Sequence, residues 1–191
     1  MITLTLYNGE TRQVPQGSTY LALAEEFAKD FATPIVEVIF NGETIDLQVP
    51  LQEDGTVDFI ELKGEDGMRV YVRSLLFLFI VTSKKLYPDV DIEVHNTLGS
   101  ALHCVFKGEN KLSAKALKLI EAEMRKLVEE KAPLKDEDGL MLGALCTNEC
   151  YITDFKMMPF QEGIILDYPN FSDWKELVNF KDLTKLNAAF R

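Results

Sequence analysis

The stretch that most constrains the fold of this chain is VYVRSLLFLFIVTSKKLYPD, residues 70–89. Seven consecutive apolar residues, 75–81, follow an arginine and a serine. A membrane-spanning helix needs about 18 to 20 apolar residues in a row, far more than this run offers. Apolar residues that cover the whole circumference of a helix are typical of a helix buried on all sides. The stretch therefore predicts a buried helix inside a folded domain.

The composition is that of an ordinary soluble protein. The chain has 191 residues, 47% of them hydrophobic and 27% charged, which suffices for one domain or two small ones. Its net charge of −11 disfavours nucleic acid as a partner, because an acidic chain repels phosphate backbones. The first residues, MITLTLYNGE, lack a signal-peptide pattern. We expect a cytoplasmic protein with no membrane partner and with reduced cysteines.

Residues 1–63 have the pattern of a small mixed domain. Alternating apolar residues before Asn8-Gly9 predict a hairpin. Gly17-Ser18-Thr19 predicts the start of a helix, with a hydroxyl group capping free backbone amides. Further strands are expected at Ile35–Phe40 and 56–62. Two strands, a crossing helix and then more strands are the order of a β-grasp fold.

A second module is expected after the polar, glycine-rich sequence Gly64-Glu65-Asp66-Gly67, which is typical of a domain boundary. A helix with one apolar face should follow Ser113, whose hydroxyl is a suitable N-cap. Besides the buried helix, this module should contain strands at 90–94, 101–106, 151–157 and Gly163–Asp167.

Three parts of the chain carry a resemblance to a known family. They are GEDGMRVYVRSLLFLFIVTSKKLYPD, the strand 101–106, and the helix opened by LSAKALKLIEAEMRKLVEE. The first module resembles the TGS domain at the start of threonyl-tRNA synthetases. The second resembles the editing-type domain that follows it there and is shared with alanyl-tRNA synthetases. The resemblance implies an α+β fold, with a β-grasp domain at 1–63 and a degenerate editing-like domain at 68–191 whose helices pack on an antiparallel sheet.

Four local stretches resemble bacterial uridine (nucleoside) kinases that carry these two modules ahead of a kinase domain. They are RSLLFLF, HNTLGSALHCVF, GALCTNECYITDFKMMPFQEGIIL and FKDLTKLNAAFR. This resemblance implies that the parent protein continues beyond Arg191 with a P-loop kinase domain that uses ATP and Mg²⁺. The chain itself has no Gly-x-x-x-x-Gly-Lys-Ser/Thr motif, so we expect no cofactor in it.

The resemblance also implies what this chain has lost. Editing domains use a His-x-x-x-His pair and a later Cys-x-x-x-His pair, which fall here on Arg73, Phe77, Met141 and Leu145. A guanidinium cannot ligate a metal or accept a proton at neutral pH, and the other three side chains offer no such chemistry. We expect no metal at these degenerate positions and no catalytic residue.

Arg73 has two interpretations. It is an arginine near a helix start that reaches solvent or a nearby carboxylate. Alternatively, it anchors a small anionic effector, by gripping a carboxylate or phosphate in the cleft between its helix and the strands at 101–106 and 151–157.

A new zinc site is a further alternative, because two thiolates and two imidazoles suit zinc. Its candidates would be His95, His103, Cys104, Cys146 and Cys150. The spacing of Cys146 and Cys150 is not the tight Cys-x-x-Cys knuckle, and adjacent residues of a strand point to opposite faces. We therefore interpret these cysteines as buried or edge thiols.

Three functions remain open. The first is a non-catalytic regulatory region of a nucleoside kinase, which senses a ligand or mediates contact between subunits of a homo-oligomer. The second is a hydrolase that edits aminoacyl-tRNA, and the third is an RNA-binding module. For the third, the basic candidates are Lys84-Lys85 and Lys111, Lys115 and Lys118.

Overall fold

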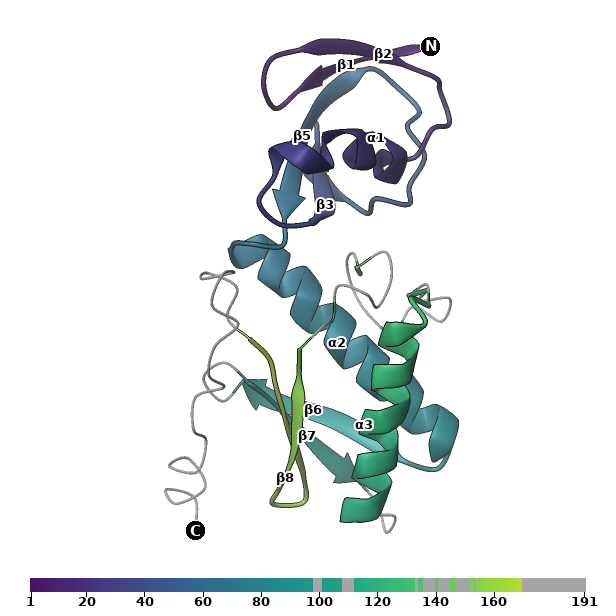
Figure 1. The fold of residues 1–191 in the computed structure, drawn as a ribbon, viewed down its shortest axis with the longest axis vertical. Helices are drawn as coiled ribbons and strands as arrows, with labels where there is room; N and C mark the ends of the chain where they lie inside the picture. Colours follow the sequence, from purple (N-terminus) through teal and green to yellow (C-terminus); the bar gives the residue numbers. More distant parts are fainter. Residues whose placement is uncertain are drawn as a thin grey trace.

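A computed structural model gives the fold of most of the chain. It describes residues 1–97, 101–107, 112–132, 134–135, 140, 145–146, 152 and 154–169. These residues form two sheets joined by one long helix (Figure 1). We call the part built on the first sheet the β-grasp module and the part built on the second sheet the helix–sheet module. The predicted domain limits, 1–63 and 68–191, stay a prediction.

The β-grasp module is a five-stranded mixed sheet with strand order β2-β1-β5-β3-β4. The central strands β1 and β5 are parallel, and the other neighbours are antiparallel. Helix α1 packs on one face, where it shares an apolar core with the sheet. This arrangement confirms the β-grasp prediction. The elements are β1 (Ile2–Leu6), β2 (Thr11–Val14), α1 (Tyr20–Phe27), the 3-10 turn η1 (Ala28–Asp30), β3 (Ile35–Phe40), β4 (Glu43–Ile45) and β5 (Gly55–Glu61).

Local sequence explains the start of α1 and the turn between β3 and β4. The Thr19 hydroxyl accepts a hydrogen bond from the Ala22 amide at 3.2 Å, as the capping pattern predicted. Asn41 and Gly42 have φ values of 51° and 88°, and positive φ at both central residues suits a tight hairpin turn.

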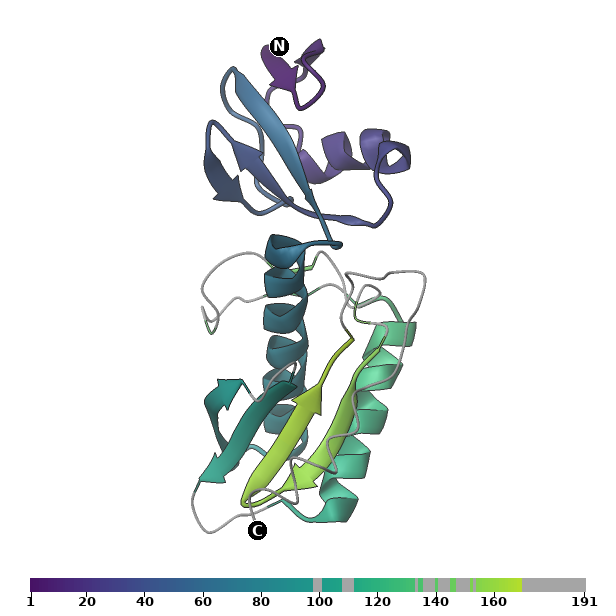
Figure 2. The same ribbon diagram turned by 90° about the vertical axis from the view of Figure 1, so that its left-hand side faces the viewer.

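The helix–sheet module is a four-stranded antiparallel sheet with order β6-β7-β9-β8. Helices α2 and α3 contact each other and share the apolar core on one face of this sheet (Figure 2). This confirms the predicted α+β class. The elements are α2 (Glu65–Leu86), β6 (Asp91–Thr97), β7 (Ala101–Lys107), α3 (Ala114–Glu129), β8 (Lys156–Phe160) and β9 (Gly163–Asp167).

The strand predicted at 151–157 overlaps β8 only at its end, because β8 begins at Lys156; its predicted start is wrong. Ile152 and Phe155 are apolar, as strand residues facing a core would be, and they are fully or almost fully buried. The backbone of Asp154 instead bonds to a helix, since its carbonyl accepts a hydrogen bond from the Tyr71 hydroxyl at 2.6 Å. Burial here therefore comes from packing on α2 rather than from sheet pairing.

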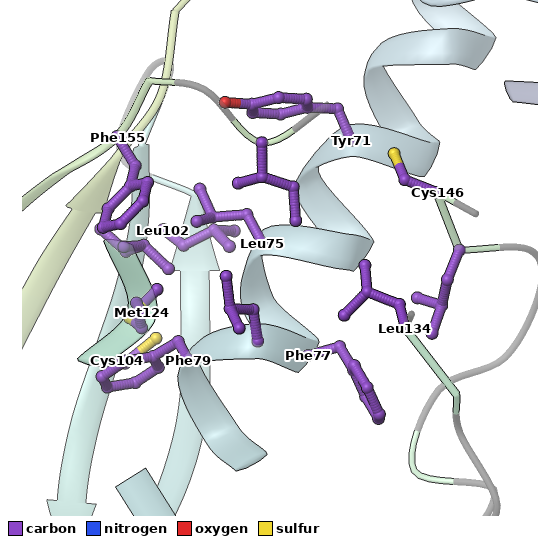
Figure 3. Packing of buried hydrophobic residues seen from close by; sticks show 14 of the residues in the cluster. Tyr71, Leu75, Phe77, Phe79, Leu102, Cys104, Met124, Leu134, Cys146 and Phe155 are labelled. Carbon is purple, nitrogen blue, oxygen red and sulfur yellow. The ribbon is translucent and has the colours of Figure 1, made fainter. Parts of the chain in front are cut away.

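The long apolar helix is buried as predicted. Side chains of α2 such as Leu75 and Phe79 have no exposed surface and pack with Leu102 and Cys104 of β7 (Figure 3). At its start, Gly67 lies so close to the end of β5 that an added Cβ would stand 2.1 Å from the Glu61 carbonyl oxygen. The first turn of α2 thus packs closely against the end of the β-grasp module.

Candidate functional site

The degenerate metal-ligand positions of α2 begin with Arg73, which is partly buried. Its charge acts on the carboxylate of Glu37, which lies on β3 and is 9% exposed. Burial raises the pKa of the Glu37 carboxyl above its usual value, while the positive charge of Arg73 opposes this shift. The charge of Arg73 therefore acts on a carboxyl of the β-grasp module, and both interpretations of Arg73 stay predictions.

Phe77, one turn further along α2, is a core residue. Its side chain is 4% exposed and belongs to the same apolar cluster as Leu134 and Leu145. Figure 3 shows Phe77 on the Leu134 side of the helix, apart from Phe79 and Cys104. Phe77 and Leu145 are thus used for packing. Met141, the fourth degenerate position, lies outside the described residues.

The cleft expected between α2 and the strands is filled by side chains. Leu75 and Phe79 of α2, Leu102 and Cys104 of β7, and Phe155 belong to one buried cluster (Figure 3). An effector therefore has no room at this position among the described side chains.

Sequence reasoning missed a pair of buried hydrogen bonds on α2. The Ser74 hydroxyl donates to the Val70 carbonyl at 2.7 Å and accepts from the Cys146 amide at 2.7 Å. Ser74 and Cys146 have no exposed surface. The one signal in the sequence was a serine directly before the apolar run 75–81, and its partner lies 72 positions away.

Arg125 of α3 also holds the segment before β8. Its guanidinium stacks on the Phe155 ring at 4.4 Å from the centroid and donates to the Phe155 carbonyl at 2.9 Å. It also pairs with Glu121 at 2.7 Å, its i, i+4 neighbour on α3. Together with the Tyr71 hydroxyl, Arg125 fixes the chain that leads into β8.

The candidates for a new zinc site are divided between two faces of the second sheet. Cys104 belongs to the core, whereas the His103 ring lies 5.6 Å from that of His95 and 5.2 Å from that of Phe160. The prediction that His103 and Cys104 point to opposite faces is confirmed. Within the described ranges, no three His, Cys, Asp or Glu side chains come together as a metal site would require. Cys150 lies outside those ranges.

The described groups around α2 do not suit water activation. Burial raises the pKa of the Cys104 thiol to about 12 and raises that of the Tyr71 hydroxyl as well. Burial, and after it the charge of His95, lowers the pKa of His103, which faces away from α2. Arg73 and Phe77 do not fit the metal that an editing site would hold. What Arg73 can do is bind an oxyanion.

The relatives found by comparison with known proteins include threonine–tRNA ligases. The threonine–tRNA ligase of Desulforamulus reducens is 29% identical over 135 residues, which are 71% of this chain and 21% of the relative. That of Streptococcus equi subsp. zooepidemicus is 28% identical over 169 residues, 88% of this chain and 25% of the relative. This chain is homologous to the N-terminal region of threonine–tRNA ligases. It spans about a fifth to a quarter of the length of these relatives.

No family model matches the chain. The relatives support the predicted resemblance to the TGS and editing region of the synthetase, and nothing in the comparisons supports the nucleoside-kinase parent. Within the part of the chain that the structure describes, helices fall short of the length and apolarity needed to cross a membrane.

Proposed function

We propose that this chain is a non-catalytic binding module related to the N-terminal region of threonine–tRNA ligases. In this proposal it binds the anionic end of its ligand near Arg73 and does not hydrolyse it. The observation that carries the proposal is which side chains stand at two positions of α2. At two positions where the resemblance implies imidazoles, Phe77 is 4% exposed in the core and Arg73 offers a cation.

The names of the relatives make tRNA the first ligand to test. A guanidinium recognises phosphate or carboxylate groups through paired hydrogen bonds. The phosphates of RNA and analogues of an aminoacyl group both offer oxygen acceptors for such bonds. The net charge of −11 limits binding to a local contact, because most of the surface repels phosphates.

One feature of the fold supports an RNA ligand in particular. Of the lysines predicted as basic candidates, Lys84 and Lys85 lie at the end of α2, and Lys115 and Lys118 lie at the start of α3. A groove of about 650 Å³ there has Tyr87, Ser113 and Lys115 among its lining residues. Lys111 lies outside the described residues. Lys84 and Lys118 are exposed in the neighbouring turns. Asp89 also lines the groove, so its charge is mixed and its contribution should be modest.

A role beside a nucleoside kinase has no such support. It rested on local sequence stretches, and the relatives that cover 71% to 88% of the chain are threonine–tRNA ligases. The proposed binding function does not depend on what the parent protein contains.

The test is binding of the tRNA for threonine to the chain and to two arginine variants. A bidentate arginine contact contributes about 1.5–3 kcal/mol, so Arg73→Ala should weaken binding about tenfold or more. Arg69→Ala is the matched control, because Arg69 lies one turn earlier and already pairs with Glu65 and Asp66 at the surface. It should change the affinity by less than about twofold.

Two results would contradict this proposal. One is the absence of any saturable tRNA binding by the unmutated chain at low salt. The other is equal loss of affinity in both arginine variants, which would show that α2 contributes only unspecific charge.

A further inference from the structure

The groove between the end of α2 and the start of α3 has a largely apolar wall. Two of its lining residues are large apolar side chains that stay exposed, Leu119 at 52% and Leu86 at 38%. Tyr87 lines it as well and is partly buried. The volume of about 650 Å³ lies within the usual range for sites that bind small organic groups, about 300–1,000 Å³. The groove therefore offers room and apolar surface for a flat organic group.

The charges around this groove are mainly positive. Residues 84–91 and 112–119 contain four lysines and two aspartates, in a chain whose net charge is −11. Lys85 already pairs with Glu123 at 2.9 Å. Lys115 is the cationic side chain that lines the groove itself, opposed by one of the aspartates. The surroundings thus suit a ligand that joins an apolar face to a negative charge.

We propose that this groove binds an unpaired nucleotide of RNA, with its base on the apolar wall and a neighbouring phosphate on Lys115. A single strand offers both a base face and a phosphate to a protein. Duplex RNA keeps its bases stacked inside and presents phosphates and sugars, so it would leave the apolar wall unused. This inference rests on the proposed function, since it takes RNA as the ligand and adds which part of the RNA is recognised and where.

The groove is separate from Arg73. Arg73 and Leu86 are thirteen positions apart on α2, which is about 20 Å along the helix axis. Figure 1 shows the last turn of α2 at the end of the helix away from the β-grasp module. A large RNA can touch both places, whereas a short single strand can fill the groove alone. Binding of a short strand should therefore not depend on Arg73.

The test is titration of the full chain with the adenosine trinucleotide, a short single strand, followed by the backbone amide signals of α2 and α3. Leu119→Ser removes exposed apolar surface without adding a charge, so the trinucleotide should bind about fivefold more weakly. Lys115→Ala removes the phosphate contact and should weaken binding about threefold. It should also make the decline of log affinity with log salt shallower by about 0.7, as expected for one contact to a single strand.

Matched controls lie at exposed positions elsewhere. Val49→Ser makes a similar change on the β-grasp module, where this valine is 41% exposed. Lys126→Ala removes a lysine from the last turn of α3. Each control should change the affinity for the trinucleotide by less than about twofold, and Arg73→Ala should leave it unchanged. A blunt-ended RNA duplex should bind the unmutated chain and Leu119→Ser equally.

Four results would overturn this inference. One is an equal loss of affinity in the groove variants and the controls, and another is a duplex affinity that falls as much as that of the trinucleotide in Leu119→Ser. A third is binding of a peptide rich in glutamate and leucine that Leu119→Ser weakens, without binding of the trinucleotide, which would make the groove a protein-docking surface. The fourth is a trinucleotide that does not bind while tRNA binds through Arg73, which leaves the proposed function standing. If the trinucleotide binds in the groove but tRNA affinity does not depend on Arg73, this inference stands and the proposed Arg73 contact falls.

Discussion

Replacing Phe77 by histidine restores an imidazole at a position where an editing site would have one. The structure predicts a loss of stability instead of a gained ligand, because this side chain is 4% exposed inside an apolar cluster. Removing a buried phenyl ring forfeits about 1.5–3 kcal/mol of transfer free energy. An imidazole left there without a hydrogen-bond partner costs a further 1–3 kcal/mol or so. Since the two effects overlap, Phe77→His should lower the free energy of unfolding by about 2–4 kcal/mol.

Guanidinium denaturation of Phe77→His and Phe77→Leu, each with zinc and with chelator, measures this loss. The leucine variant is the matched control, because it reduces volume while keeping an apolar side chain, and it should cost about 1.5 kcal/mol or less. Zinc should leave the midpoints of both variants unchanged. The reasoning is refuted if the histidine variant is as stable as the leucine variant, or if zinc stabilises it specifically.

Three further outcomes are expected. Ser74→Ala leaves the buried Cys146 amide without its 2.7 Å acceptor, so the free energy of unfolding should fall by about 1–3 kcal/mol; a change below about 0.5 kcal/mol in denaturant midpoints would argue against the bond. Gly67→Ala should lower the free energy of unfolding by about 1–3 kcal/mol despite alanine's helix propensity, because its Cβ would stand 2.1 Å from the Glu61 carbonyl oxygen. Thermal melts of the variant and the unmutated chain check this. Burial raises the pKa of Glu37, so its contribution to the free energy of unfolding is fully present below the unfolded pKa and is lost as pH rises through the folded pKa. Glu37→Gln should flatten this decline. Parallel curves of unfolding free energy against pH for both proteins, from pH 4 to 7, would contradict it.

The fold could be predicted where local chemistry decides it. The hairpin before β2, the Thr19 cap and the buried helix α2 all follow from turn residues, capping groups and apolar spacing within a few positions. The strand expected at 151–157 could not be predicted correctly, because its apolar residues pack on a helix. The Asp154 carbonyl accepts a hydrogen bond from the Tyr71 hydroxyl, 83 positions away, and no local sequence pattern predicts such a bond.

The candidate site was predictable only in part. The residue types at Arg73 and Phe77 were enough to question metal chemistry, since neither side chain can ligate zinc. The electrostatic effect of Arg73 on Glu37 could not be predicted, because Glu37 belongs to another module and looks from sequence like one charged residue in a strand. Its burial depends on a bulge in β3 and on how α2 leaves β5, and these are properties of the assembled fold.

The central claim, that this chain binds without catalysing, is tested most directly by hydrolysis of mischarged tRNA for threonine. The purified chain is incubated with the mischarged tRNA and added zinc, and release of the amino acid is followed over time. We predict a rate equal to that of buffer with zinc alone, because Arg73, Phe77 and Leu145 provide neither a metal site nor a general base. Release above that background, abolished by replacing one residue of this chain, would contradict the account.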